Sequence, residues 1–315
     1  ASQLKQASGI PFMQSPDAVA MQTSVVDAKL QSPVLHGNKL GCKRRLEDVP
    51  QLSGATPNPG KLSRGESSEG GALQAVGKPK AELVLDDGTR WQGTPFGADC
   101  GISGEVVFNT GMVGYPEALT DPSYRGQILV LTYPLVGNYG VPSFDKIDAF
   151  GLPTYFESKD VQIAGLVVSS YSEDPSHWAS TRSLGSWLEE AGVPAIFGVD
   201  TRMLTKSLRE RGAMLGRLEV GSDKPTGDFV DPNLRHLVAE VSTKTIVTYG
   251  VAGGPKIVAI DCGMKFNIIR YLVEAHGVEL TVVPHDYDLE TNPAKLEWDG
   301  VFCSNGPGDP SKCAA

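Results

Sequence analysis

The loop Gly306-Pro307-Gly308 has the clearest chemical potential in this sequence, and it lies inside the segment CSNGPGDPSKCAA. Glycine permits positive φ and a close approach of the backbone, whereas proline fixes φ. Consecutive exposed N–H groups in such a loop can bind a carboxylate or stabilise an oxyanion. The alternative is a tight strand-to-helix turn that binds nothing. Its position directly after an expected strand favours a ligand site.

A second candidate is Ser123, in the run TDPSY between two expected strands. Asp-Pro-Ser is typical of a turn, and a turn without further function is the simpler interpretation. If its hydroxyl is exposed, Ser123 could instead reach a ligand across a domain interface.

Two cysteines and one histidine follow or end expected strands in the last quarter of the chain: Cys262, Cys303 and His285. A nucleophilic cysteine needs a base and an electropositive setting, and the sequence indicates no histidine partner. We therefore interpret both cysteines as non-catalytic and His285 as a surface residue. The histidines lack metal-ligand spacing and no P-loop is present, so no metal or nucleotide site is expected.

Composition excludes several classes of protein. The length of 315 residues allows two domains, and 40% hydrophobic residues support real cores. A formal net charge of −9 makes nucleic acid an unfavourable partner. Five cysteines without a CxxC pair favour a reducing compartment over a zinc site or disulfide framework. The sequence contains no apolar run of about 18 residues, so it predicts no membrane span. The N-terminus lacks a secretory signal and an Arg-rich transit peptide, which favours the cytoplasm, with the mitochondrion or a plastid as alternatives.

The chain divides into segments of different composition. Residues 1–80 are rich in Gly, Ser, Pro, Gln and Lys, with Phe12 as their one aromatic residue, and predict a disordered tail. Residues 81–247 predict a mixed α/β domain. Residues 256–315 predict the start of a parallel sheet, after a weak linker at Thr248–Pro255.

Apolar runs and helical periodicity predict the individual elements. In the first domain we expect a hairpin over 82–93, a strand that enters a Gly-rich bend over 104–115, strands over 128–131, 161–171 and 193–200, and helices over 181–191 and 201–211. In the second we expect strands over 256–263, 278–284 and 299–306, and a helix over 265–275.

Short apolar strands joined by a helix are typical of βαβ units in a parallel sheet, whose ligands bind at the carboxyl ends of the strands. The glycine loop follows such an end. One helix cannot cover both faces of a parallel sheet. We therefore expect the second domain to be incomplete at Ala315; a compact end and a fold completed by a partner are the alternatives.

Several long blocks also resemble a known family. The stretch GEVVFNTGMVGYPEALTDPSYRGQILVLTYPLVGNYG resembles the N-terminal domain of the glutamine-dependent carbamoyl-phosphate synthase small subunit, and GVDTRMLTKSLRERGAMLG and LVAEVSTK continue the match. VAIDCGMKFNIIRYL and VFCSNGPGDP resemble the opening of its class I glutamine amidotransferase domain. The resemblance covers nearly all of residues 81–310. It is closest to the fused eukaryotic enzymes, with a separate small subunit and the ammonia-using mitochondrial type as alternatives.

This resemblance implies an activity and a partner. The family hydrolyses glutamine and passes ammonia to a synthetase, as a large subunit or fused domains, which makes carbamoyl phosphate for pyrimidines or arginine. ATP and divalent metal belong to that synthetase, so no cofactor is expected in this chain. The residues matching Ser123, Gly306 and Gly308 contact glutamine in the family. The nucleophilic cysteine, histidine and glutamate are expected beyond Ala315, so the chain alone is expected to be inactive.

Two other hypotheses stay open at this point. One is a class I amidotransferase that serves another synthase, although the other members lack a domain like that of residues 81–245. The other is a non-catalytic docking or regulatory module that binds a synthetase.

Overall fold

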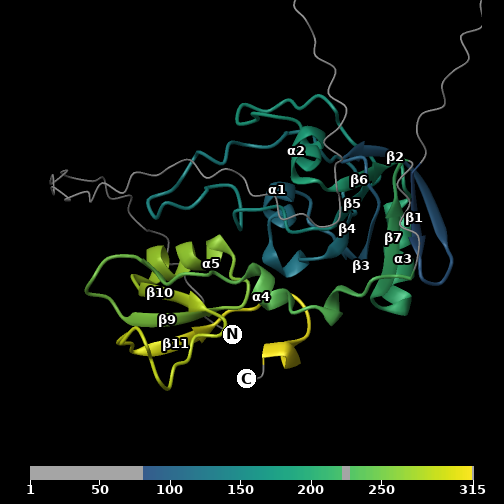
Figure 1. The fold of residues 1–315 in the computed structure, drawn as a ribbon. Helices are drawn as coiled ribbons and strands as arrows, with labels where there is room; N and C mark the ends of the chain where they lie inside the picture. The colour runs from purple at the N-terminus through teal and green to yellow at the C-terminus, as the bar shows by residue number, and fades with distance from the viewer. Residues whose placement is uncertain (1–80, 222–227, 314–315) are drawn as a thin grey trace, which may run out of the picture. The chain divides into compact units, whose positions relative to one another are not determined.

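The computed structural model describes residues 81–221 and 228–313, which belong to one compact unit. The predicted disordered tail at residues 1–80 lies outside the described residues. Within them the chain forms a closed barrel followed by a four-stranded sheet (Figure 1). The predicted combination of a mixed α/β domain and a parallel-sheet domain is confirmed.

The barrel contains both parallel and antiparallel pairs. Its strands are β1 (Ala81–Leu85), β2 (Arg90–Gly97), β3 (Ile102–Asn109), β4 (Gln127–Leu131), β5 (Gly165–Val168), β6 (Pro194–Phe197) and β7 (Met214–Glu219). Around the barrel their order is β1-β2-β6-β5-β4-β3-β7, and antiparallel pairing of β1 with β7, with Leu83 opposite Leu218, closes it. Strand β4 pairs in parallel with β3 and with β5, and β5 also pairs in parallel with β6. Such pairs require crossover connections, which the intervening helices and long loops supply.

Helices and short 3₁₀ turns connect the strands: α1 (Tyr115–Leu119), η1 (Pro122–Tyr124), α2 (Leu184–Ala191), α3 (Thr201–Arg211), η2 (Pro232–Leu234) and α4 (Leu237–Val241). Helix α3 has the predicted bounds, because Asp200 caps its first turn by accepting a hydrogen bond from Met203 N. Helix α2 begins later than predicted, because Ser183 accepts from Ser186 N and acts as its N-cap.

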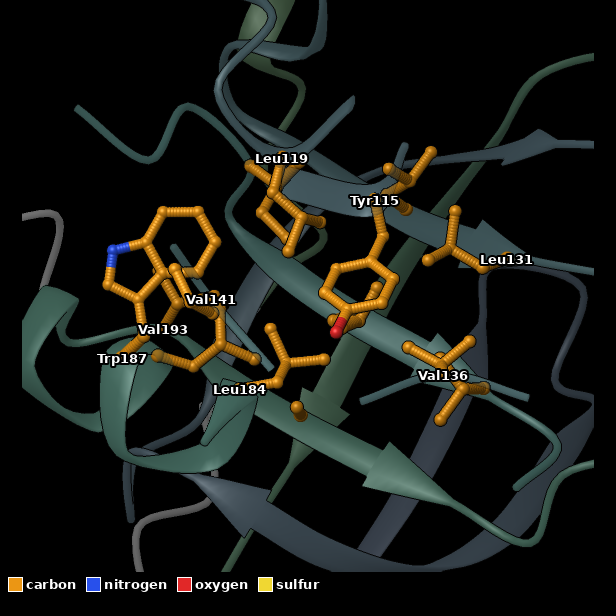
Figure 2. Packing of buried hydrophobic residues seen from close by; sticks show 14 of the residues in the cluster. Tyr115, Leu119, Leu131, Val136, Val141, Leu184, Trp187 and Val193 are labelled. Carbon is orange, nitrogen blue, oxygen red and sulfur yellow. The ribbon is translucent and has the colours of Figure 1, made fainter. Parts of the chain in front are cut away.

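The strand β4 explains how the barrel is stabilised on both of its faces. Ile128 and Val130 belong to one buried cluster, and Leu129 and Leu131 belong to another. Alternate residues of a strand point to opposite faces, so a strand buried on both faces is a continuous apolar run. Figure 2 shows the second cluster, which also contains Leu184 and Trp187 of α2.

The second sheet has the strand order β11-β9-β10-β8. Its strands are β8 (Val247–Tyr249), β9 (Lys256–Asp261), β10 (Glu279–Pro284) and β11 (Gly300–Cys303). Strand β9 pairs in parallel with β10 and β11, as predicted, whereas β8 is antiparallel to β10. The prediction of a linker from Thr248 is therefore wrong at its start. Val, Thr and Tyr have high strand propensity, and they add an edge strand here.

One helix packs on this sheet in the described part of the chain. Helix α5 (Phe266–Arg270) continues into a π-helical turn, Tyr271–Ala275, where the sequence predicted one regular helix. Ile269 and Val273 are buried against Ala259, Leu280 and Val282 of the sheet. Figure 1 shows α5 beside β10 and β9. On β11, Val301 is 48% exposed.

None of the helices in residues 81–221 and 228–313 combines the length and the apolar character needed to cross a bilayer.

Candidate functional site

The carboxyl ends of the three parallel strands form the edge where the sequence predicted a ligand. Strands β9, β10 and β11 end at Asp261, Pro284 and Cys303, and parallel strands present these ends on the same side of the sheet. The glycine loop follows β11 directly, as predicted.

The backbone of the loop requires both of its glycines. Gly308 has a φ of 79°, in the region that favours glycine. A Cβ added to Gly306 would lie 1.8 Å from the carbonyl oxygen of Cys262, so no side chain fits there. Pro307 is buried between the two exposed glycines. Within the described residues, neither the Gly306 nor the Gly308 amide donates a hydrogen bond. The loop therefore offers two free donors to an anionic or carbonyl oxygen.

Two buried polar residues that the sequence analysis missed hold this edge in shape. Asp261 Oδ1 accepts hydrogen bonds from Gly263 N at 2.9 Å and Met264 N at 2.7 Å. Its Oδ2 accepts from Thr243 N at 2.7 Å. Ser304 Oγ accepts from Cys262 N at 2.9 Å, which ties the start of the glycine loop to the end of β9. The available sequence signal was a polar residue at the end of two of the apolar strands, Asp261 in β9 and Ser304 directly after β11.

Ser123 is held by a neighbouring carboxylate and keeps its hydroxyl free. Asp121 Oδ1 accepts a hydrogen bond from Ser123 N at 2.9 Å. Asp121 Oδ2 lies 3.1 Å from Lys265 Nζ. Burial by itself lowers the pKa of Lys265, but the charge and hydrogen bond of Asp121 outweigh it and the net pKa is raised. In the part of the chain that the structure describes, the Ser123 hydroxyl has no hydrogen-bond partner.

The turn from Cys262 to Lys265 connects the two candidate segments. A Cβ added to Gly263 would lie 3.3 Å from Gly306 Cα, so this turn packs against the glycine loop. Two residues later, Lys265 pairs with the carboxylate that holds Ser123. The structure thus places Ser123 and the glycine loop on two sides of one turn, although they are far apart in the sequence.

The barrel also fixes the start of α5, and therefore Lys265. Glu157, in the long loop between β4 and β5, accepts hydrogen bonds from Phe266 N at its carbonyl and from Asn267 N at its carboxylate, at 3.0 and 2.9 Å. One helical turn further, Arg270 Nε lies 2.7 Å from Asp148 Oδ2. Helix α5 is thus held by residues of the loop between β4 and β5 rather than by a side-chain cap of its own.

The environment of Cys262 opposes a role as the catalytic nucleophile. Cys262 Sγ and Cys303 Sγ are 4.0 Å apart. Burial, followed by the charge of Cys303, raises the pKa of Cys262 to about 12, whereas a nucleophilic cysteine requires a lowered pKa. No hydrogen bond joins His285 to either thiol among the described residues. The prediction of a surface histidine is wrong, because the His285 side chain is 15% exposed and its ring packs 5.1 Å from that of His236.

No group of three or more His, Cys, Asp or Glu side chains in residues 81–221 and 228–313 is arranged to hold a metal ion.

Two family models match the chain, one over the barrel and one over the second sheet. The model described as "Glutamine amidotransferase class-I" matches residues 258–315, which contain the parallel strands and the glycine loop. The model described as "Carbamoyl-phosphate synthase small chain, CPSase domain" matches residues 83–218, which contain the barrel. The second sheet is therefore the opening part of a class I glutamine amidotransferase region.

Full-length relatives show which family this combination represents. "Multifunctional protein CAD" of Squalus acanthias is 55% identical over 234 residues, covering 74% of this chain and 10% of that protein. "Carbamoyl-phosphate synthase (ammonia), mitochondrial" of Homo sapiens is 49% identical over 245 residues, covering 78% of this chain and 16% of that protein. "Multifunctional protein URA2" of Saccharomyces cerevisiae is 48% identical over 270 residues, covering 76% of this chain and 12% of that protein. The chain belongs to the carbamoyl-phosphate synthase small-chain family and spans a small part of each of these relatives.

A crystal structure of a peptidase M28 precursor from Shewanella amazonensis aligns with a TM-score of 0.24 at 12% identity, over 66% of this chain and 52% of that one, and supports no argument.

Proposed function

We propose that this chain forms the N-terminal part of the glutamine amidotransferase of a carbamoyl-phosphate synthase, and that Ser123, Gly306 and Gly308 form one side of its glutamine site. The observation that carries the proposal is the pair of free glycine amides on an exposed loop at the carboxyl edge of the sheet. The unpaired Ser123 hydroxyl, on the other side of the Cys262–Lys265 turn, supports it.

Each of these groups has a defined task in amide hydrolysis. Attack on the side-chain amide of glutamine places negative charge on its carbonyl oxygen, and preorganised backbone N–H groups stabilise such an oxyanion. The Gly306 and Gly308 amides supply donors of this kind. The Ser123 hydroxyl can hydrogen-bond the polar groups of the glutamine and orient it. The nucleophilic cysteine and its histidine and glutamate partners are expected from residues beyond Ala315, so the chain as given is inactive in this proposal.

The ammonia that is released passes to a synthetase, either fused domains or a separate large subunit, which holds ATP and divalent metal. The product is carbamoyl phosphate for the pyrimidine or the arginine pathway. The boundaries that we propose for the two domains are residues 81–247 and 256–315, with Thr248 and Tyr249, the first two residues of the predicted linker, belonging to β8. The cytoplasm is the proposed location, with the mitochondrion or a plastid as alternatives.

A second candidate is a region that no longer hydrolyses glutamine. The mitochondrial human relative, named for ammonia, is 49% identical over the aligned residues. In that case the barrel and sheet would serve as a docking or regulatory module of an ammonia-dependent synthetase.

Glutamine hydrolysis by the full-length protein separates these candidates. The encoding transcript is sequenced across codon 315, and the encoded protein is assayed for glutamine-dependent and ammonia-dependent carbamoyl phosphate synthesis. The proposal predicts that Gly308→Ala lowers the glutamine-dependent rate and spares the ammonia-dependent one. The control is Gly198→Ala, at a glycine with a φ of 88° and open space around it.

Three results would contradict this proposal. They are an unchanged glutamine-dependent rate in Gly308→Ala, an ammonia-dependent rate alone in the wild type, and hydrolysis of glutamine by the 315-residue chain in isolation.

A further inference from the structure

Two thiols lie side by side at the carboxyl edge of the sheet. Cys303 is the last residue of β11, and Cys262 directly follows β9. Cys303 pairs in register with Ile260, so Cys262 is two residues further along the neighbouring strand. Residues two apart on a strand share a face, which explains why the two Sγ atoms approach to 4.0 Å.

Both thiols can be reached by a reagent, in contrast to the remaining described cysteine of the barrel. Cys303 is exposed and Cys262 is partly exposed, whereas Cys100 is 3% exposed. Cys313 is also exposed and lies near enough for its charge to raise the pKa of Cys262. The edge therefore contains a close pair of thiols with a third thiol in its neighbourhood.

We propose that Cys262 and Cys303 form a reversible intramolecular disulfide, which makes the carboxyl edge of the second sheet a redox modification site. This inference rests on the positions of the sulfur atoms and does not depend on the proposed glutamine hydrolysis.

The oxidant is a low-molecular-weight disulfide such as oxidised glutathione. The exposed Cys303 loses its proton, and its thiolate attacks one sulfur of the reagent, which forms a mixed disulfide and expels one glutathione thiolate. The Cys262 thiolate then attacks Cys303 Sγ and expels the second glutathione thiolate. Both released thiolates take up a proton. The protein thiols lose two electrons in total and the reagent gains two, so one disulfide replaces another.

The surroundings of Cys262 make the second step the slow one. Burial is the largest cause of its raised pKa of about 12, and the charge of Cys303 is the next. A raised pKa keeps most of this cysteine as a thiol at neutral pH, and only the thiolate attacks. The rate of ring closure should rise with pH.

Disulfide formation would also move the glycine loop. The sulfur atoms must approach from 4.0 Å to a bond length of about 2.05 Å. Gly306 packs directly against the carbonyl oxygen of Cys262, so a shift of Cys262 displaces the loop at its most crowded contact. The oxidised and reduced proteins should therefore differ in the positions of the Gly306 and Gly308 amides.

The test treats the full chain with oxidised glutathione, blocks remaining thiols by alkylation and maps the products by peptide mass spectrometry. We expect a cross-link between the Cys262 and Cys303 peptides that dithiothreitol reverses. Cys262→Ser should leave a stable glutathione adduct on Cys303, and Cys303→Ser should abolish the cross-link. The matched control Cys313→Ser should retain it. Cys303→Ala is a second variant of the same exposed position.

Two results would overturn the inference: a stable glutathione adduct on Cys303 in the wild type without a cross-link, or a cross-link that requires Cys313. Peptide mapping tests the disulfide alone, so its failure leaves the proposed function intact. Absent glutamine hydrolysis would contradict the proposed function and leave the mapped disulfide standing.

Discussion

Arg270 on α5 and Asp148 in the long loop of the barrel form an ion pair, with 2.7 Å between Arg270 Nε and Asp148 Oδ2 and with side chains 15% and 13% exposed. The other carboxylate oxygen accepts hydrogen bonds from Phe150 N and Leu152 N, both at 2.9 Å. Arg270 also donates to the carbonyl of Pro153. One ion pair thus organises the loop and joins it to the helix that follows the proposed glutamine edge.

Replacing Asp148 by Asn should destabilise the protein in a pH-dependent way. Burial alone raises the pKa of Asp148, but the hydrogen bond from Arg270 and those from the Leu152 and Phe150 amides outweigh it, so the net pKa lies below the ordinary 3.8. A lowered pKa gives a stabilisation that is complete above the unfolded-state value and is lost as pH falls through the folded-state value. We expect a loss of about 2–3 kcal/mol near neutral pH, because Arg270 is left without its charged partner.

Urea unfolding at neutral pH and at about pH 2 measures this effect. Asp174→Asn is the control, since Asp174 is exposed. The difference between wild type and Asp148→Asn should shrink at low pH. A difference that is equal at both pH values would contradict an ionic origin.

Gly306→Ala should impair glutamine hydrolysis in the full-length protein more than Gly308→Ala. At Gly306 the added Cβ meets a backbone oxygen at 1.8 Å, which cannot move aside, whereas at Gly308 it meets the flexible Leu237 side chain at 3.2 Å. Loss of one oxyanion donor lowers kcat by about 100-fold or more. Steady-state kinetics with glutamine, and with ammonia as the bypass substrate, measure the effect. A larger loss in Gly308→Ala would show that the contact at Cys262 does not position the loop.

Ser123→Ala should change glutamine affinity and leave stability nearly unchanged. The hydroxyl has no partner among the described residues, so its removal should alter the free energy of unfolding by less than about 0.5 kcal/mol. Loss of one hydrogen bond to the substrate should raise KM for glutamine about 10-fold. Ser123→Thr, which retains a hydroxyl, should preserve part of the affinity. Equal KM values in wild type and Ser123→Ala would remove Ser123 from the proposed site.

Phe156→Ala should strongly destabilise the barrel. Phe156 is 1% exposed, its ring stacks on Phe144 with centroids 3.6 Å apart, and Trp187 packs against it edge-on. Truncation of a buried phenylalanine costs about 4 kcal/mol. Phe156→Leu, which keeps most of the apolar volume, should cost much less in chemical denaturation. Tyr271→Ala, at a side chain 62% exposed, is the surface control. A similar loss in Phe156→Ala and Tyr271→Ala would contradict the packing argument.

The fold was predictable where local signals agreed with tertiary structure. The bounds of α3 followed from the helical spacing of Leu204 and Leu208 and from the following Gly212. Helix α1 was missed because Gly114 and Pro116 indicate a bend; the structure uses Gly114 at a φ of 82° as N-cap and Pro116 in the first turn, where its missing N–H does no harm. The predicted strand over 161–171 is reduced to β5, because pairing rather than apolar character decides where a strand ends.

The candidate site was predictable only in its local parts. The position of Gly306 and Gly308 after a parallel strand follows from the sequence pattern. The pairing of Lys265 with Asp121 depends on how the barrel meets the second sheet, which no local pattern encodes. The partial burial of His285 depends on the same arrangement, since its ring contacts His236, the N-cap residue of α4.

The closure of the barrel has a consequence for synthesis of the protein on the ribosome. Leu83 in the first strand pairs with Leu218 in the last, so the nascent barrel remains open until nearly all of its sequence has left the exit tunnel. Pairings this distant in sequence form slowly, and the unpaired strand edges attract other chains in the meantime. The contacts that hold α5 and the glycine loop can therefore form only after the barrel has closed. We expect chaperones to act mainly on the open, incompletely folded barrel.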